Sequence, residues 1–418
     1  MAIAERSVTD VCVAARAAAR KLAALDSGAK DDALHAIADA LEARSDEIVE
    51  ANARDMEAGR EAGLSDALLD RLMLDPGRIA AIAAQVRDIA ALRDPVGEVI
   101  EGFRLPNGLD VRKERVPLGV VAVVYEARPN VTIDAAALCL KSGNAIVLRG
   151  SSSAAHSNAV LAGIAAEHAP EGAIQLVGGG REALADLARQ EGLVDLIIPR
   201  GGEGLKAALR ELATVPVIYA ASGNCHVYVD AVADLFAAEA IVLNAKTQRP
   251  GVCNAAETLL VHADAAAQFL PRALRALHDA GVELRVDGRA RALAGENLAA
   301  ELHDAEESDW DEEFLALVLA VKVVDSVEEA IAHVNAHGSG HSEAIVTRDA
   351  ESARAFRLGV DAACVYVNAS TRFTDGGEFG MGAEIGNSTQ KLHARGPIGL
   401  RELCTFKYVV EGDGHIRP

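Results

Sequence analysis

From Gly119 onwards, short continuous runs of Val, Ile and Leu alternate with longer Ala-rich stretches of helical period. Strands that are buried on both faces of a parallel sheet have this composition, whereas half-exposed strands alternate apolar with polar residues. Parallel neighbours also need a crossover connection, usually a helix. The alternation therefore predicts an α/β fold on a parallel sheet. We expect its first strands at Val120–Tyr125, Ala145–Leu148, Ala173–Val177 and Asp195–Ile198.

A second α/β unit is predicted between residues 232 and 370. The chain has 418 residues, which is too long for one small core, so it should divide into two or three units. Residues 5–93 have Ala, Leu, Arg and Glu at helical spacing and should be helical. In the second unit we expect strands at Thr258–Val261, Leu317–Val324, Glu343–Thr347 and Ala363–Asn368.

An antiparallel hairpin should precede the first parallel strand. Two strand-like runs, Val96–Phe103 and Leu109–Val116, flank Asn107-Gly108. Asn-Gly between such runs is a strong hairpin signal because both residues tolerate positive φ. The chain ends in another β-prone run, Leu403–Val410, which could add to the sheet of another subunit.

The composition excludes several classes of protein. The formal charge of −21 and the pI near 5.0 disfavour binding to nucleic acid. No charge-free apolar stretch approaches the ~20 residues of a membrane helix, and the N-terminus lacks the features of a secretory signal. The six cysteines are far apart without a Cys-x-x-Cys pair, so disulfides and zinc are not expected. We expect a cytoplasmic protein that binds no nucleic acid, no membrane and no metal.

Cys253 lies where a polar stretch with Lys246 and Arg249 ends in Pro250-Gly251 and an apolar β-prone run begins. A loop cysteine near backbone N–H groups and cations is favoured as a thiolate, the nucleophilic form. The alternative is a small buried apolar residue, which is the usual role of a free cysteine. This window by itself favours neither.

Two glycine-rich turns join predicted strands to predicted helices, at residues 178–180 and 200–204. Such turns suit a nucleotide phosphate at a helix N-terminus. Neither is a Gly-x-Gly-x-x-Gly fingerprint, and glycines that only make tight connections are the alternative.

Five long motifs give the chain a resemblance to the aldehyde dehydrogenase superfamily. They are Tyr125–Asp134, Leu140–Gly150, Asn224–Asp230, the Cys253 window, and Tyr366–Gly377 continuing to Pro397. The resemblance implies a Rossmann-type cofactor domain, an α/β catalytic domain and a β-hairpin oligomerisation arm. The implied cofactor domain comprises residues 1–103 and 122–231, with a return at 371–386. The implied catalytic domain is 232–370, and the arm and tail are 104–121 and 387–418.

The resemblance also implies a reaction. Its closest pattern is that of members that reduce L-glutamyl 5-phosphate to L-glutamate 5-semialdehyde with NADPH in proline biosynthesis, releasing phosphate. Cys253 is then the nucleophile that forms a thioester. Asn130, with the backbone N–H of Cys253, is the implied oxyanion donor; an Asx turn after Pro129 is its alternative. A homo-oligomer and functional coupling to a glutamate 5-kinase are expected.

One stretch departs from the oxidising members of the superfamily. Those enzymes carry a water-activating glutamate before a Gly-Gly pair, whereas residues 216–225 contain no acid here. Without a general base, water is a poor acceptor for the thioester, which favours a reductase. A dehydrogenase for another short semialdehyde is the rival enzyme. A cysteine hydrolase or acyl transferase with His226 or His262 as base is a rival of another class.

The resemblance implies further contacts for cofactor and substrate. Arg149 follows a predicted strand and could hold the 2′-phosphate of NADPH; a solvent-facing arginine is its alternative. Glu313 matches a carboxylate that binds the nicotinamide ribose, or is one more solvated acid. The remaining implied cofactor contacts are Ser151, Ser152, Gly201 and Gly202, and the implied substrate contacts are Arg249, Arg372, Ser370 and Thr371.

Overall fold

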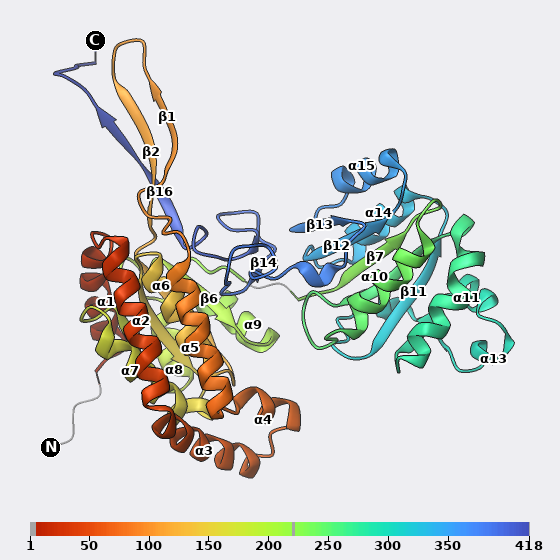
Figure 1. Ribbon diagram of the computed structural model, residues 1–418, viewed down its shortest axis with the longest axis horizontal. Coiled ribbons are helices and arrows are strands. Elements are labelled where there is room, and N and C mark those ends of the chain that lie inside the picture. Colours follow the sequence, from red (N-terminus) through yellow and green to blue (C-terminus); the bar gives the residue numbers. More distant parts are fainter. Residues whose placement is uncertain (1–5, 220–221, 418) are drawn as a thin grey trace. The chain divides into compact units, whose positions relative to one another are not determined.

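The computed structural model describes residues 6–219 and 222–417 (Figure 1). Contacts between residues divide the chain into two compact units, which are described separately. The first unit is Met1–Tyr219, Gly380–Gly386 and Ile398–Pro418, and the second is Ala220–Phe379 and Asn387–Pro397.

Helices open the first unit, as the helical spacing predicts. Asp26 and Asp75 cap two of them by accepting backbone N–H groups at 2.8 and 2.7 Å, and Pro76 begins the helix after Asp75. The helices are α1 (Val8–Leu22), α2 (Ser27–Ala43), α3 (Ser45–Glu61), α4 (Asp66–Leu72) and α5 (Pro76–Ala91).

A four-stranded parallel sheet with the order β5-β4-β3-β6 forms the core of the first unit. All four predicted strands are confirmed: β3 (Val120–Tyr125), β4 (Ala145–Gly150), β5 (Ile174–Leu176) and β6 (Leu196–Arg200). Each leads to a helix, respectively α6 (Asn130–Lys141), α7 (Ala155–His168), α8 (Arg181–Ala188) and α9 (Glu203–Leu212). Because the strands are parallel, both glycine-rich turns lie at the carboxyl edge of this sheet.

The second unit contains a seven-stranded parallel sheet with the order β10-β9-β11-β8-β7-β12-β13. The four predicted strands are β8 (Ala256–His262), β11 (Val318–Val324), β12 (Ser342–Val346) and β13 (Cys364–Val367). The prediction omitted β7 (Cys225–Val229), β9 (Glu283–Val286) and β10 (His303–Asp304). The latter two are short and include polar residues, so they lack the continuous apolar run that identifies a buried strand.

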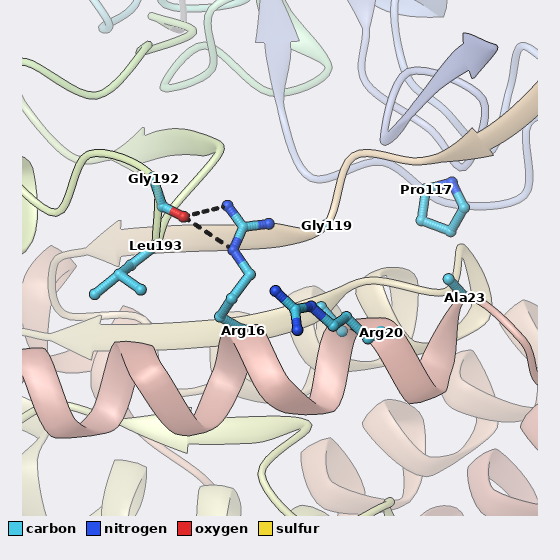
Figure 2. Close-up of a pocket in the computed structure, with 8 residues that line it drawn as sticks. Arg16, Arg20, Ala23, Pro117, Gly119, Gly192 and Leu193 are labelled. Atoms are coloured by element: carbon cyan, nitrogen blue, oxygen red, sulfur yellow. Dashed lines mark hydrogen bonds between the residues drawn. The ribbon is translucent and has the colours of Figure 1, made fainter.

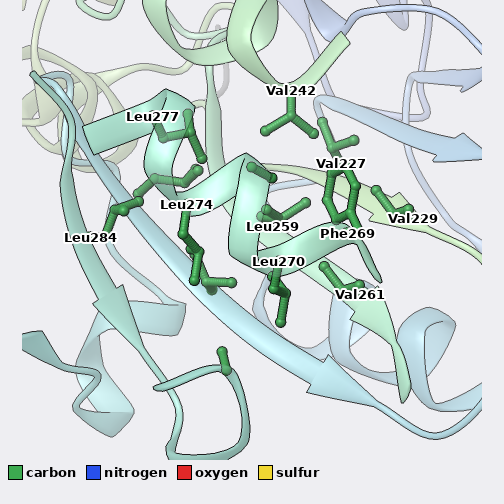
Figure 3. Close-up of a cluster of buried hydrophobic side chains, with 14 of the residues drawn as sticks. Val227, Val229, Val242, Leu259, Val261, Phe269, Leu270, Leu274, Leu277 and Leu284 are labelled. Carbon is green, nitrogen blue, oxygen red and sulfur yellow. The ribbon is translucent and has the colours of Figure 1, made fainter. Parts of the chain in front are cut away.

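Helices cover the sheet of the second unit and create its core. Figure 3 shows Phe269 and Leu270 of α11 among the strand residues Val227, Leu259 and Val261, all of them buried in one cluster. The helices are α10 (Leu235–Thr247), α11 (Ala263–Asp279), α12 (Gly288–Leu293), α13 (Glu296–Ala299), α14 (Val327–His337) and α15 (Ala350–Gly359).

The predicted hairpin is confirmed, and the tail pairs with it. Strands β1 (Val99–Arg104) and β2 (Asp110–Pro117) are antiparallel, and β16 (Cys404–Glu411) pairs antiparallel with β2. In Figure 1 these strands extend beyond the helices of the first unit. All residues of β1 are exposed, as are most of β16.

The bounds of the compact units differ from the implied domains at residues 222–231, where β7 joins the sheet of the second unit, and near the C-terminus. Residues 371–379 belong to the second unit, where the hydroxyl of Thr371 donates to the carbonyl of Asn254 at 2.7 Å. Residues 387–397 also belong there, where β14 (Asn387–Ser388) pairs with β15 (Gly396–Pro397). None of the helices described is both long and apolar enough to cross a membrane.

We predict that the exposed arm mediates self-association. The side chains of Phe406, Tyr408 and Val410 are 46%, 58% and 54% exposed on β16, and a sheet with two exposed faces has little core of its own. Removing residues 405–418 should therefore lower the mass measured by light scattering. Leu403 and Cys404 stay in place because both are buried. Ile416→Ser, which changes an exposed residue beyond β16, is the control; an unchanged mass after the deletion would contradict the prediction.

Candidate active site

Cys253 is the accessible cysteine of the chain. It is half-buried on the loop between α10 and β8, whereas the other five cysteines are buried free thiols. Burial raises the pKa of Cys12 to about 11 and that of Cys404 to about 12, which keeps these thiols protonated. Access and loop position thus favour Cys253 as nucleophile over the buried apolar alternative.

The segment before β7 packs directly on the backbone of Cys253. A Cβ atom at Gly223 would overlap the Cys253 carbonyl group, so only glycine fits there. The N–H of Gly223 donates to Glu313 Oε1 at 2.6 Å, and Cys225 Sγ donates to the Cys253 carbonyl at 3.2 Å. The structure therefore brings Glu313, Gly223 and Cys253 together. Ala220 and Ala221, which belong to the stretch without acids, lie outside the described residues.

A buried ion pair joins the two ends of the cysteine loop. Lys246 lies in the last turn of α10 and Glu257 is the second residue of β8; their side chains are paired and fully buried. Burial raises the pKa of Glu257 to about 7 and lowers the pKa of Lys246, and the attraction between the two charges opposes both shifts. Glu257 Oε1 also accepts the N–H of Leu315 at 3.3 Å, which connects the pair to the segment of Glu313.

The four predicted substrate residues gather beside Asn254, the residue after Cys253. Arg372 donates to the side chains of Gln248, at 2.8 Å, and Asn254. Burial and then the nearby Arg249 lower the pKa of Arg372, and Asp375 and Cys253 oppose this shift. Ser370 caps the short 3-10 turn Thr371–Phe373, and Thr371 bonds Asn254. Asn254, which orients both Arg372 and this turn, was not among the predicted residues, because no local pattern marks it.

Both histidines proposed as a base are engaged by other groups. His226 follows Cys225 on β7, and successive strand residues point to opposite faces. The His226 ring Nδ1 lies 3.0 Å from buried Glu343. His262 accepts the N–H of Asp264 as the cap of α11. These partners do not favour either histidine as the base of a cysteine hydrolase or acyl transferase.

Asn130 begins α6 in the first unit. Its side-chain amide donates to Asp134 Oδ2 at 2.9 Å, one helical turn further on, rather than closing an Asx turn. Burial raises the pKa of Asp134 to about 6, and the Asn130 hydrogen bond opposes this shift. Because Asn130 and Cys253 belong to different units, the oxyanion role of Asn130 stays a prediction.

The turn that contains Gly201 and Gly202 binds a carboxylate in the structure itself. Glu126 Oε2 accepts the N–H of Gly202 at 2.9 Å, at the N-terminus of α9. A Cβ atom at Gly201 would lie 2.6 Å from the same oxygen, so glycine permits this approach. Backbone N–H groups at a helix N-terminus attract anions. This turn is thus suited to hold a phosphate of a dinucleotide.

Arg149 and the serines after it lie at the same edge of the sheet. The Arg149 guanidinium donates to the carbonyl of Gly180 at 3.0 Å, so it is held against the other glycine-rich turn and is not freely solvated. Burial lowers the pKa of Arg149. Ser151 Oγ accepts the N–H of Ala127 at 3.1 Å and bonds Ser153 at 2.6 Å, while Ser152 is exposed.

The first unit also contains a cavity that lies away from the two glycine-rich turns. Its volume is about 480 Å³, and it is lined by Arg16 and Arg20 of α1 and by Gly119, at the amino end of β3 (Figure 2). The Arg16 guanidinium donates to Gly192 and to Asp195, which orders the fold rather than a ligand. The cofactor turns lie at the opposite end of the strands. In the described residues, no cluster of His, Cys, Asp and Glu could hold a metal ion.

Comparison with known proteins agrees with this arrangement. The model of the aldehyde dehydrogenase family matches residues 1–292 and 299–409. The chain therefore belongs to the aldehyde dehydrogenase family. An acetylating aldehyde dehydrogenase from Geobacillus thermoglucosidasius shares the fold, with a TM-score of 0.70 over 98% of this chain and 97% of that chain at 20% identity.

Within the family, the chain is similar over its whole length to proteins that carry one name. The chain is 57% identical to gamma-glutamyl phosphate reductase from Thermobifida fusca, over 99% of each protein. The crystal structure of gamma-glutamyl phosphate reductase from Thermotoga maritima has a TM-score of 0.95 at 44% identity, covering 99% of this chain and 100% of that one. These matches place the chain among the gamma-glutamyl phosphate reductases.

We predict that the Lys246–Glu257 pair holds the cysteine loop in place. Lys246→Met or Glu257→Gln should each lower the free energy of unfolding by ~3–5 kcal/mol, because one buried partner loses its counter-charge. The double variant Lys246→Met/Glu257→Met should recover most of this loss. Urea unfolding measures the stability. The rate at which iodoacetamide labels Cys253 measures how well the loop is held in place.

The control is Arg348→Met, which breaks an exposed ion pair of the same unit with Asp234 and should change neither quantity. Single variants that unfold at the wild-type urea concentration would show that the pair does not constrain the loop.

Proposed function

We propose that the chain reduces L-glutamyl 5-phosphate to L-glutamate 5-semialdehyde with NADPH, releases phosphate, and forms a thioester on Cys253. The observation that carries this proposal is the accessible Cys253 on a loop fixed at both ends, with Arg249 and Arg372 beside it. The names of its relatives supply the substrate. In this reading the enzyme acts in proline biosynthesis.

The chemistry begins at the acyl carbon of the substrate. The Cys253 thiolate attacks that carbon, the bond to the phosphate oxygen breaks, and phosphate leaves with the electron pair. When bound, NADPH supplies a hydride for the thioester carbon. Collapse of the resulting thiohemiacetal breaks the C–S bond and returns the thiolate. The backbone N–H of Cys253 and the amide of Asn130 are the proposed donors to the oxyanion.

Two arginines fit a substrate with two anionic groups. Arg249 and Arg372 are close enough for one to lower the pKa of the other, so an anion between them would relieve their repulsion. Ser370 and Thr371 stand on the same turn and are proposed as further contacts. We assign this cluster to binding of the substrate next to Cys253.

The first unit is the proposed holder of the dinucleotide. Gly201 and Gly202 fit a phosphate group, since the N–H of Gly202 already donates to an anionic oxygen, that of Glu126. Arg149, Ser151 and Ser152 are proposed around the 2′-phosphate of the adenosine ribose, and Glu313 at the nicotinamide ribose. Arg149 Nε is buried without a hydrogen-bond partner in the described part of the chain, so it has a donor to offer.

A reductase is favoured over a hydrolysing dehydrogenase. Residues 216–225 contain no acid, and the carboxylates near the loop are engaged: Glu313 by Gly223 and Glu257 by Lys246. We further propose a cytoplasmic homo-oligomer that is functionally coupled to a glutamate 5-kinase. The exposed arm supports self-association, and the lability of an acyl phosphate favours a nearby supplier.

The reverse reaction tests the assignment. With fresh L-glutamate 5-semialdehyde and NADP, the enzyme should release a small burst of NADPH and then stall, because the thioester awaits an acceptor. Added phosphate or arsenate should support steady turnover. Cys253→Ala should abolish both burst and turnover while NADP binding persists, whereas Cys364→Ala, a buried cysteine of the same unit, should retain them. Steady NADPH release without phosphate would falsify the reductase assignment.

We also predict that Arg149 selects NADPH. A charge-assisted contact to the 2′-phosphate contributes ~1.5–3 kcal/mol, so Arg149→Ala should raise the KM for NADPH roughly ten- to a hundredfold and leave that for NADH nearly unchanged. Arg181→Ala, an exposed arginine after the same glycine turn, is the control. Equal losses with both cofactors would mean that Arg149 only supports the turn of Gly180.

A further inference from the structure

The second unit contains a cavity that is separate from the cluster of residues around Asn254. Its volume is about 490 Å³, and it opens at the amino end of β12, between the end of α14 and the segment 389–395. The charged residues that line it are Glu343, Asp361, Lys391 and Arg395, and Gly338 and Gly340 expose backbone there. Acidic and basic groups thus share one small space.

One pole of this cavity is Glu343, whose side chain is completely buried. Glu343 Oε2 accepts the backbone N–H of His226 at 2.7 Å and lies 3.0 Å from its ring Nδ1. Oε1 has no hydrogen-bond partner among the described residues, and a Cβ atom at Gly338 would lie 2.9 Å from it. Burial raises the pKa of Glu343. A buried oxygen without a donor is costly, and a ligand donor would offset that cost.

The other pole carries an excess of positive charge. Asp361 accepts from Lys391 at 2.6 Å and from Arg395 at 2.8 Å, so two cations share one carboxylate. Arg395 Nε is buried and has no hydrogen-bond partner in the part of the chain that is described. An anionic group of a ligand would complete this pole, since a guanidinium and an ammonium both favour carboxylates.

We propose that this cavity binds the head group of an α-amino acid, with its ammonium at Glu343 and its carboxylate at Lys391 and Arg395. A zwitterion matches both poles, whereas phosphate would be repelled by Glu343 and a metal cation by the two basic groups. The ligand is either the amino-acid end of the substrate, which rests on the proposed function, or a free amino acid that acts as an effector.

Two hydrogen bonds and one peptide step connect the cavity to the backbone of Cys253. Glu343 bonds the backbone of His226, and the preceding residue, Cys225, donates to the carbonyl of Cys253 at 3.2 Å. Contact with Glu343 therefore bears on the strand that supports the cysteine loop. Binding of an amino acid in the cavity should therefore change the rate at which iodoacetamide labels Cys253, whether the amino acid is substrate or effector.

Calorimetric titration of the full chain with L-glutamate tests the proposal. Glutarate, which lacks the ammonium, and 4-aminobutyrate, which lacks the α-carboxylate, should bind at least about tenfold more weakly. Glu343→Gln and Arg395→Gln should each weaken L-glutamate binding by a similar factor. Arg348→Gln, which changes an exposed arginine of the same unit outside both sites, should leave it within about twofold. Arg395 is partly exposed, so its variant reports binding even where Glu343→Gln fails to fold.

Two results would overturn the proposal: equal binding of glutarate, or full retention of L-glutamate binding in both Arg395→Gln and a folded Glu343→Gln. Inhibition kinetics then separate the two sources. L-glutamate that competes with L-glutamyl 5-phosphate indicates the substrate end, and L-glutamate that binds without competing indicates an effector. Calorimetry needs no turnover, so failure of the proposed reaction would leave the binding result readable.

Discussion

The buried ion pair between Lys246 and Glu257 is the constraint on which the site depends. It joins the two ends of the loop that carries Cys253. The N–H of Leu315 donates to Glu257 and so connects a third segment to the pair. A buried pair is not in itself a source of stability, because desolvation offsets the attraction between the charges. Its effect here is on geometry. If either end of the loop shifted, the two buried charges would separate and each would lose its partner.

Solvent exposure distinguishes the thiol of Cys253 from those of the other five cysteines. The other five cysteines are buried, and burial raises the pKa of Cys12 and Cys404, whereas Cys253 is half-buried on a loop whose neighbours are cationic. The same loop leaves no room for a side chain at Gly223. Packing and electrostatics thus act on one residue: the backbone is fixed by its neighbours, and the side chain remains available to a substrate.

Much of the fold was predictable because local sequence determines it. Strand β3 is a continuous apolar run, β8 contains the apolar run 259–261, and the turn at Asn107-Gly108 is specified by residues that tolerate positive φ. Strands β9 and β10 escaped prediction because they are short and partly polar. The pairing of β16 with β2 joins segments almost three hundred residues apart, and no local pattern specifies such a partner.

The sequence by itself determined the alternation of strands and helices, the cysteine window and the motifs of the family, because each depends on neighbouring residues. Only the tertiary structure decided which distant groups meet. It placed Glu313 at Gly223, the guanidinium of Arg149 at Gly180, and Glu343 in a cavity with Lys391 and Arg395. The physical reason is that a parallel sheet collects loops from separate crossovers at one edge, and strand order, which is set by packing of the whole unit, determines which loops become neighbours.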